Sequence, residues 1–222
     1  MKPKYYKERY TLKPRSYRDV PGWINDAEYV FPKMVSKAQD GFHFVEIGVL
    51  LAQSTTHMAQ LIKDSGKDIK FDSIDIFWPI EHALRHHSLT GHPDSFAKYW
   101  NDIREKWDMT FVDTISHPLR WLNLTDYVNF ITCDEKFAHK IYGDNSLDFV
   151  WIDGDHGEDI VYNDLVNFWP KLKVGGTIGG DDIEYDEVSN DVKKFSKEYG
   201  VDVVYDTVVG EPTYNSFLIT KE

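Results

Sequence analysis

The sequence predicts an α/β protein built on a doubly wound, seven-stranded, mostly parallel sheet with an antiparallel C-terminal hairpin strand. Three observations predict this fold class. Segments with strand-like and helix-like periodicity alternate along the chain from about residue 26. Segment 146–155 (SLDFVWIDGD) is hydrophobic without alternation at its centre, as a strand covered on both faces should be. The last two apolar runs are joined by a Gly-Glu-Pro turn, which indicates a hairpin.

The elements of this fold can be assigned in chain order. The expected strands are 42–48, 70–77, 128–134, 146–155 and 175–182, followed by the hairpin strands 201–209 and 214–221. The expected helices are 26–39, 54–65, a short stretch ending at Tyr142, 159–169 and 189–199. Ser54 is a candidate cap for the helix 54–65, and Gly200 stands where the C-terminal cap of the helix 189–199 belongs.

Two segments fall outside this alternation. Residues 1–25 are basic and rich in tyrosine, and we expect an N-terminal arm or lid preceding a single domain over 26–222. Residues 78–127 follow the second strand, so they leave the sheet at the edge where doubly wound sheets bind ligands, and we expect a cap insertion. We expect its histidines, at 82, 86, 87 and 92, to lie in a solvated loop rather than to form a second metal site. Its tryptophans either line a substrate pocket or pack within the protein.

Composition limits the classes of function. The formal net charge of −12 over 222 residues argues against a nucleic-acid partner, since that binding depends on neutralising phosphates. No apolar run is long enough to span a membrane, and the basic N-terminal stretch lacks the apolar core of a signal peptide. The single cysteine, Cys133, fits a reducing compartment. We therefore expect a cytoplasmic enzyme with a small-molecule substrate, and a homodimer stays open.

The first strand and the second strand each end in a candidate nucleoside-binding feature. Gly48 directly follows the first strand, where a residue without a side chain lets a ligand approach the backbone. Neither GxGxxG nor GxxxxGK[ST] is present, so the turn does not predict a dinucleotide or a nucleoside triphosphate. Asp75, at the end of the second strand, is where an acidic residue accepts both hydroxyls of a ribose. Together the two features favour an adenosine-type ligand.

An acidic cluster is the strongest chemical signal. Its members follow the ends of two strands that we expect to be neighbours: Asp153, Asp155, His156, Asp181 and Asp182. Carboxylates placed so close together repel one another, so they need a cation or raised pKa values. Hard oxygen ligands suit Mg²⁺, Mn²⁺ or Ca²⁺, and a single histidine without cysteine argues against structural zinc.

Four segments and the closing hairpin carry a resemblance to a known family: FHFVEIGVLLAQST, FDSIDIF, SLDFVWIDGDH and DLVNFWPKLKVGGTIGGDD. They resemble the class I S-adenosylmethionine-dependent methyltransferases, which have a Rossmann-like fold. Within that class they are most similar to the small-molecule group typified by macrocin O-methyltransferase, with the catechol and caffeoyl-CoA enzymes more distant. The similarity spans about residues 26–220.

The resemblance implies a role for each matching residue. It assigns six residues to the cofactor: Glu46, Gly48, Ser54, Asp75, Asp134 and Asp153. Among these, Glu46 and Gly48 would hold the methionine end, Asp75 the ribose, and Asp134 the adenine. Asp153, Asp181 and Asp182 match the carboxylates that bind a divalent metal, and Asp155 and His156 match positions used as the general base. Ala52 departs from the family, which usually has a second glycine there.

These observations predict an S-adenosylmethionine-dependent methyltransferase that acts, with a divalent cation (Mg²⁺), on the hydroxyl of a sugar, polyol or phenol. Methyl transfer needs orientation of donor and acceptor, and a metal with a nearby base activates a poorly nucleophilic hydroxyl. Between the two base candidates, the sequence slightly favours Asp155, with His156 as its orienting partner or alternative. Two rival functions stay open: a hydroxylase-like reaction on the same scaffold, and a non-catalytic cofactor-binding protein.

Overall fold

The structure is a computed structural model that describes residues 11–20, 22, 24, 26–77, 108–206 and 216–222. The strands are β1 (Phe42–Ile47), β2 (Ile69–Asp75), β3 (Asn129–Thr132), β4 (Leu147–Ile152), β5 (Leu172–Gly180), β6 (Val204–Asp206) and β7 (Ser216–Thr220). The α-helices are α1 (Ala27–Lys37), α2 (Gln53–Ser65), α5 (Phe111–Trp121), α6 (Glu135–Ala138), α7 (Ile160–Phe168) and α8 (Asp186–Tyr199). Short 3₁₀ helices are η1 (Tyr17–Asp19), η2 (Thr125–Tyr127), η3 (His139–Ile141) and η4 (Trp169–Lys171).

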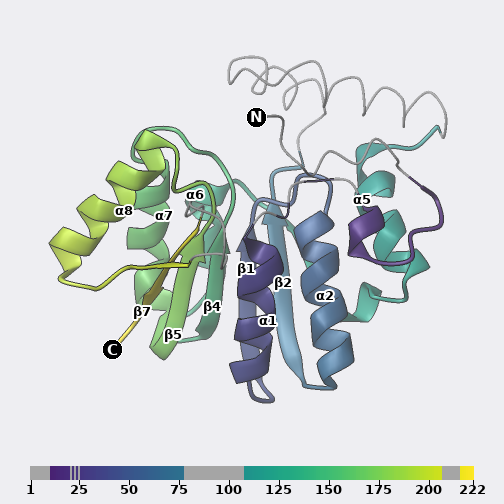
Figure 1. Cartoon of the computed structure of the whole chain (residues 1–222), viewed down its shortest axis with the longest axis horizontal. Coiled ribbons are helices and arrows are strands. Elements are labelled where there is room, and N and C mark those ends of the chain that lie inside the picture. The colour runs from purple at the N-terminus through teal and green to yellow at the C-terminus, as the bar shows by residue number, and fades with distance from the viewer. Residues whose placement is uncertain (1–10, 21, 23, 25, 78–107, 207–215) are drawn as a thin grey trace.

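The strands form one sheet in the order β3-β2-β1-β4-β5-β7-β6. The pairs from β3 to β5 are parallel, whereas β7 runs antiparallel to both β5 and β6. The predicted fold class is therefore confirmed. In Figure 1, α1 and α2 lie side by side next to β1 and β2, and α7 and α8 lie side by side on the part of the sheet that holds β4, β5 and β7.

Alternation along the central strands divides the core between the two faces of the sheet. On β4, Phe149 and Trp151 pack with the helices α1 and α2, while Val150 and Ile152 pack with α7 and α8. All four side chains are buried. This is why the sequence of β4 shows no polar face: each face of the strand meets a helical layer. Among the described residues, no helix has the length and hydropathy needed to cross a bilayer.

Several boundaries differ from the sequence expectation. The expectation that Ser54 caps its helix is wrong, because α2 begins at Gln53 and its N-cap residue is Ala52, which makes no side-chain cap bond. Helix α8 begins at Asp186, earlier than expected, because acidic residues in a first turn favour the positive end of the helix dipole. Gly200 caps α8 as expected, with a φ of 65°.

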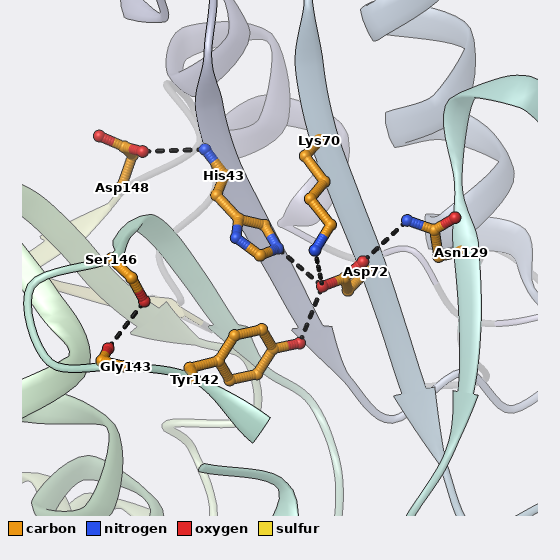
Figure 2. A network of polar contacts seen from close by, with 8 residues as sticks. All are labelled: His43, Lys70, Asp72, Asn129, Tyr142, Gly143, Ser146 and Asp148. Carbon is orange, nitrogen blue, oxygen red and sulfur yellow. Dashed lines mark hydrogen bonds and ion pairs between the residues drawn. The ribbon is translucent and has the colours of Figure 1, made fainter. Parts of the chain in front are cut away.

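A polar network centred on the buried Asp72 lies across β1, β2 and β3 (Figure 2). At its centre Asp72 Oδ2 lies 2.7 Å from His43 Nε2 and 3.4 Å from Lys70 Nζ, and it accepts a hydrogen bond from the Tyr142 hydroxyl at 3.1 Å. The Asn129 side chain donates to Asp72 Oδ1 at 2.9 Å. Burial raises the pKa of Asp72, but the hydrogen bonds and positive charges around it outweigh burial and lower the pKa to about 2. The network joins three strands through one carboxylate.

Candidate active site at the carboxyl edge of the sheet

The turn between β1 and α2 lies directly against the loop that follows β4. The backbone N–H of Asp153 donates to Ile47 O at 2.8 Å. Gly48 has a φ of 92°, and a Cβ atom built on it would lie only 1.9 Å from Asp153 O. Only glycine fits here, because both the backbone conformation and the space exclude a side chain. Further along the same turn, Leu50 and Ala52 also have positive φ values, 47° and 64°.

Asp75, the expected ribose acceptor, accepts three backbone hydrogen bonds, two of them from this turn. Its Oδ2 accepts from Val49 N at 2.9 Å and Leu50 N at 3.3 Å, and its Oδ1 accepts from Phe77 N at 2.8 Å. An ionised carboxylate has about four lone-pair sites, so acceptor capacity is left for a ligand. Sequence reasoning missed the contacts with the turn, because they depend on how two strands approach in space.

Beneath the turn, Glu46 is fully buried on β1. Its Oε2 accepts hydrogen bonds from the hydroxyls of Thr55 and Ser73, both at 2.6 Å. Its Oε1 has no hydrogen-bond partner among the described residues. Burial raises the pKa of Glu46, although the neighbouring hydroxyls oppose the change. Ser54, also buried in the first turn of α2, is one of the hydroxyls whose hydrogen bonds lower the pKa of Glu46.

The acidic cluster forms where β4 and β5 end side by side. One ligand atom from each of Asp153, His156 and Asp182 lies within 4.8 Å of the other two. His156 Nε2 is 2.8 Å from Asp182 Oδ2. Asp181 is buried next to this group, and its Oδ1 accepts a hydrogen bond from Asp182 N at 2.9 Å. The expected neighbourhood of β4 and β5 is thus confirmed, and it gathers these side chains.

The electrostatics of the cluster fit a cation. Burial, together with the negative charges of Asp181, Asp182 and Glu46, raises the pKa of Asp153 well above its ordinary value. Burial lowers the pKa of His156, but its contact with Asp182 and the charge of Asp155 outweigh burial, so the net shift is upward. A divalent cation between these three ligands would offset the repulsion, and two carboxylates with an imidazole are ligands that Mg²⁺ or Mn²⁺ accepts.

The two base candidates point to different partners. Asp155 Oδ1 accepts a hydrogen bond from Gly157 N at 2.9 Å. The His156 ring instead joins the cluster and stacks on Tyr185, with ring centroids 5.5 Å apart and planes 5° apart. Tyr185 is partly exposed and was not singled out from the sequence, since nothing in the pattern after Asp182 marks it as part of a site.

Two acidic residues follow β3. Asp134, the expected adenine contact, accepts a hydrogen bond from Lys136 N at 3.2 Å as the N-cap residue of α6, and its Oδ2 lies 2.8 Å from Lys136 Nζ. Its neighbour Glu135 was not predicted. It reaches the loop after β4, where its Oε2 accepts from Asp155 N at 3.2 Å. Its position directly after the third strand is the feature of the sequence by which Glu135 could have been recognised as a site residue.

Part of the expected cap insertion lies outside the described residues. This includes the histidines at 82, 86, 87 and 92 and the tryptophans at 100 and 107. The described end of the insertion forms α5. On this helix Trp121 is exposed, and Ile115 packs against Val49 and Ala52 of the turn between β1 and α2. His117 Nε2 lies 2.8 Å from Leu12 O, so the described part of the N-terminal arm contacts this helix.

The arrangement defines a class of protein. A seven-stranded sheet in the order β3-β2-β1-β4-β5-β7-β6, parallel except for β7, with helices on both faces, is the Rossmann-like fold of the class I S-adenosylmethionine-dependent methyltransferases. A family model described as a methyltransferase domain matches residues 45–183, which is more than half of the chain. The chain belongs to this methyltransferase-domain family.

Solved structures share the fold at low sequence identity. An S-adenosylmethionine-dependent O-methyltransferase from Thermotoga maritima is 14% identical with a TM-score of 0.56, and the alignment covers 91% of this chain and 66% of that one. An O-methyltransferase from Bacillus cereus in complex with SAH is 15% identical with a TM-score of 0.57, over 94% and 84% of the two chains.

The fold alone leaves the acceptor atom open. A precorrin-6y C5,15-methyltransferase from Geobacter metallireducens is 12% identical with a TM-score of 0.56, and the alignment covers 96% of this chain and all of that one. Because methyltransferases with differently named acceptors share this fold, the acceptor has to be argued from the site. No curated protein matches the sequence.

Proposed function

We propose that this methyltransferase transfers the methyl group of S-adenosylmethionine to a hydroxyl of a small molecule, a sugar, polyol or phenol, with the help of a divalent cation, Mg²⁺ in the first instance. The observation that carries the proposal is the convergence of Asp153, His156 and Asp182 beside the glycine turn of β1. Methyl transfer to oxygen needs an activated hydroxyl next to the cofactor, and these two features adjoin each other in the structure.

In this proposal the turn between β1 and α2 holds the cofactor. Asp75 holds the turn through Val49 N and Leu50 N, and the lone-pair site that its three hydrogen bonds leave accepts a ribose hydroxyl. Oε1 of Glu46, which has no hydrogen-bond partner in the described part of the chain, accepts from the ammonium group of the methionine end in this proposal. Gly48 and Ser54 line this end, Asp134 takes the adenine end, and Asp153 adjoins both cofactor and metal.

The acidic cluster activates the acceptor. Asp153, Asp182 and His156 would hold the cation, with the buried Asp181 next to them, and the cation would lower the pKa of a hydroxyl bound to it. The base would then accept the hydroxyl proton. Because His156 lies within the cluster, we assign the role of base to Asp155, as the sequence slightly favours, with His156 as the alternative.

The function is tested with S-adenosylmethionine labelled at the methyl group. The purified protein is incubated with sugars, polyols and phenols, including vicinal diols and catechols, and the labelled products are identified by mass spectrometry and NMR. We expect O-methyl products, loss of transfer with EDTA, and recovery with Mg²⁺. Transfer that EDTA leaves unchanged would contradict the metal, and transfer to nitrogen or carbon alone would contradict the acceptor.

The metal is tested without any acceptor. Crystals soaked with Mn²⁺ should give an anomalous peak within about 2.5 Å of the Asp153 and Asp182 carboxylates. Soaks with and without SAH show whether the metal needs the cofactor product. No peak in either soak would contradict the metal site.

The base is tested by Asp155→Asn and His156→Gln. Loss of the true base should reduce turnover about 10²–10⁴-fold while SAH binding, measured by calorimetry, is retained. If His156 instead holds the metal, His156→Gln should weaken Mn²⁺ binding as well as turnover. Near-normal turnover in both variants would show that neither residue removes the proton.

A further inference from the structure

Glu135 makes a specific contact with the loop that carries the acidic cluster. It is the first residue of α6, and its carboxylate reaches from the end of β3 to the loop after β4. There Oε2 accepts a hydrogen bond from the backbone N–H of Asp155 at 3.2 Å. Asp155 lies between Asp153 and His156, the two members of the metal cluster that this loop supplies.

Gly154 makes this contact possible. A Cβ atom at this position would lie 2.2 Å from Glu135 Oε2, whereas the nearest atom of any other residue, Ile47 Cγ2, would be 3.6 Å away. The φ of Gly154 is not positive, so its backbone does not require glycine. The lack of a side chain at Gly154 therefore leaves room for the Glu135 carboxylate.

The surroundings of Glu135 make a carboxylate unfavourable unless it has a function. Burial raises the pKa of Glu135, and the charges of Asp155, Asp134 and Asp75 raise it further. Burial and the charges of Glu135, Asp155 and Asp134 likewise raise the pKa of a second acidic residue, Asp164 of α7. Asp164 is 2% exposed, and its Oδ2 has no hydrogen-bond partner among the described residues. An apolar side chain at position 135 would avoid this repulsion, but it could not accept from Asp155 N.

We propose that Glu135 is a positioning residue that fixes the loop 153–156, so that Asp153 and His156 converge with Asp182. Glu135 acts through the Asp155 amide and touches neither metal nor substrate. The hydrogen bond stands independently of any activity, whereas its consequence for metal binding rests on the proposed function.

The hydrogen bond is tested first, by amide exchange measured by NMR on the full chain. Glu135→Ala should speed exchange of the Asp155 amide about tenfold or more, because the amide loses its acceptor. Glu135→Gln keeps an oxygen that can accept and should stay within about threefold of the original protein. Glu187→Ala removes an exposed carboxylate of α8 and serves as the charge-matched control.

Gly154→Ala should remove the hydrogen bond between Asp155 N and Glu135 by a different substitution. The added methyl displaces the Glu135 carboxylate, so this variant should reproduce the exchange behaviour of Glu135→Ala. The double variant should behave like either single variant, because one interaction is lost in all three. Gly154→Ala also keeps the test decisive if Glu135→Ala fails to fold.

Mn²⁺ affinity, measured by electron paramagnetic resonance, tests the consequence. Glu135→Ala and Gly154→Ala should weaken Mn²⁺ binding about 10–100-fold, the range for groups that orient metal ligands, while Glu135→Gln retains most of it. SAH affinity should change little in all variants. Unchanged Asp155 exchange in Glu135→Ala, or additive effects in the double variant, would overturn the positioning role. Failure of the unsubstituted protein to bind Mn²⁺ would instead overturn the metal in the proposed function, and the exchange result would still decide the role of Glu135.

Discussion

At the scale of single residues, Gly48 joins two loops that are far apart in the sequence. Its missing side chain lets the turn after β1 lie against the backbone of Asp153, and the hydrogen bond from Asp153 N to Ile47 O holds the two together. The turn after β1 and the acidic cluster are therefore fixed relative to each other by main-chain contacts. In the proposed function, this contact sets the orientation of donor and acceptor on which methyl transfer depends.

Gly48→Ala should be strongly destabilising, and Gly66→Ala is its matched control. Both glycines have positive φ values, but a Cβ at Gly66 would meet nothing within 4 Å. Gly66→Ala should lower the free energy of unfolding by about 1–2 kcal/mol, because alanine disfavours the left-handed backbone conformation at this position. Gly48→Ala should cost about 1–3 kcal/mol more, because the methyl group overlaps backbone that cannot move easily. Urea denaturation measures both, and equal losses would show that the two loops adapt to each other.

Asp75→Ala should weaken SAH binding by about 1.5–3 kcal/mol, because a charged hydrogen-bond acceptor is lost. The turn also loses the acceptor for Val49 N and Leu50 N, so the variant should lose some stability as well. Isothermal titration calorimetry measures the affinity, with Asp64→Ala on the exposed part of α2 as the control. Equal SAH affinity for Asp75→Ala and the unsubstituted protein would contradict the ribose assignment.

At the scale of elements, the Asp72 network ties β2 to β1 and β3 through side chains as well as through the backbone ladder (Figure 2). Slipping a strand by one residue would move its side chains to the opposite face, and would bury Asp72 without its donors. The network therefore favours one register of these three strands.

The network also predicts how stability depends on pH. The pKa of Asp72 is about 2 in the folded protein, below its ordinary value of 3.8. Its carboxylate therefore stabilises the folded state above about pH 4, by about 2 kcal/mol, and this contribution is lost as the pH falls from 4 towards 2. Asp72→Asn should be less stable by that amount at pH 7, and the difference should shrink below pH 4. Urea unfolding across this range measures it, and a constant difference would contradict the assignment.

The strands and helices also show how much of the fold and of the candidate site the sequence could predict. The strands β1, β2, β4 and β5 were expected because strand-like and helix-like segments alternate along the sequence. Two neighbouring parallel strands then bring Asp153, His156 and Asp182 to one edge of the sheet. Glu135 was missed, because its role depends on a contact across two loops rather than on its spacing from other acidic residues. The capping role given to Ser54 was wrong, because Ala52 adopts the left-handed conformation that begins α2.

At the scale of the whole molecule, ligand binding should raise stability by mass action. SAH at 100 times its dissociation constant should add about 2.7 kcal/mol to the free energy of unfolding. For a chain of 222 residues this corresponds to an increase of about 5–10 °C in the melting temperature. Differential scanning calorimetry with increasing SAH measures the effect, with adenosine alone for comparison. A melting temperature that does not respond to saturating SAH would contradict the assignment of the cofactor.

The order of the sheet has a consequence for how the chain is made. β7 is the last of the seven strands to leave the ribosome, yet it occupies an interior position between β5 and β6. Until it emerges, β5 presents an unpaired edge that includes Gly179 and Gly180, just before the acidic residues of the site. A nascent chain that stalls before residue 216 therefore exposes a strand edge open to pairing with other chains. We expect chains that end before β7 to be captured by chaperones or to aggregate during synthesis.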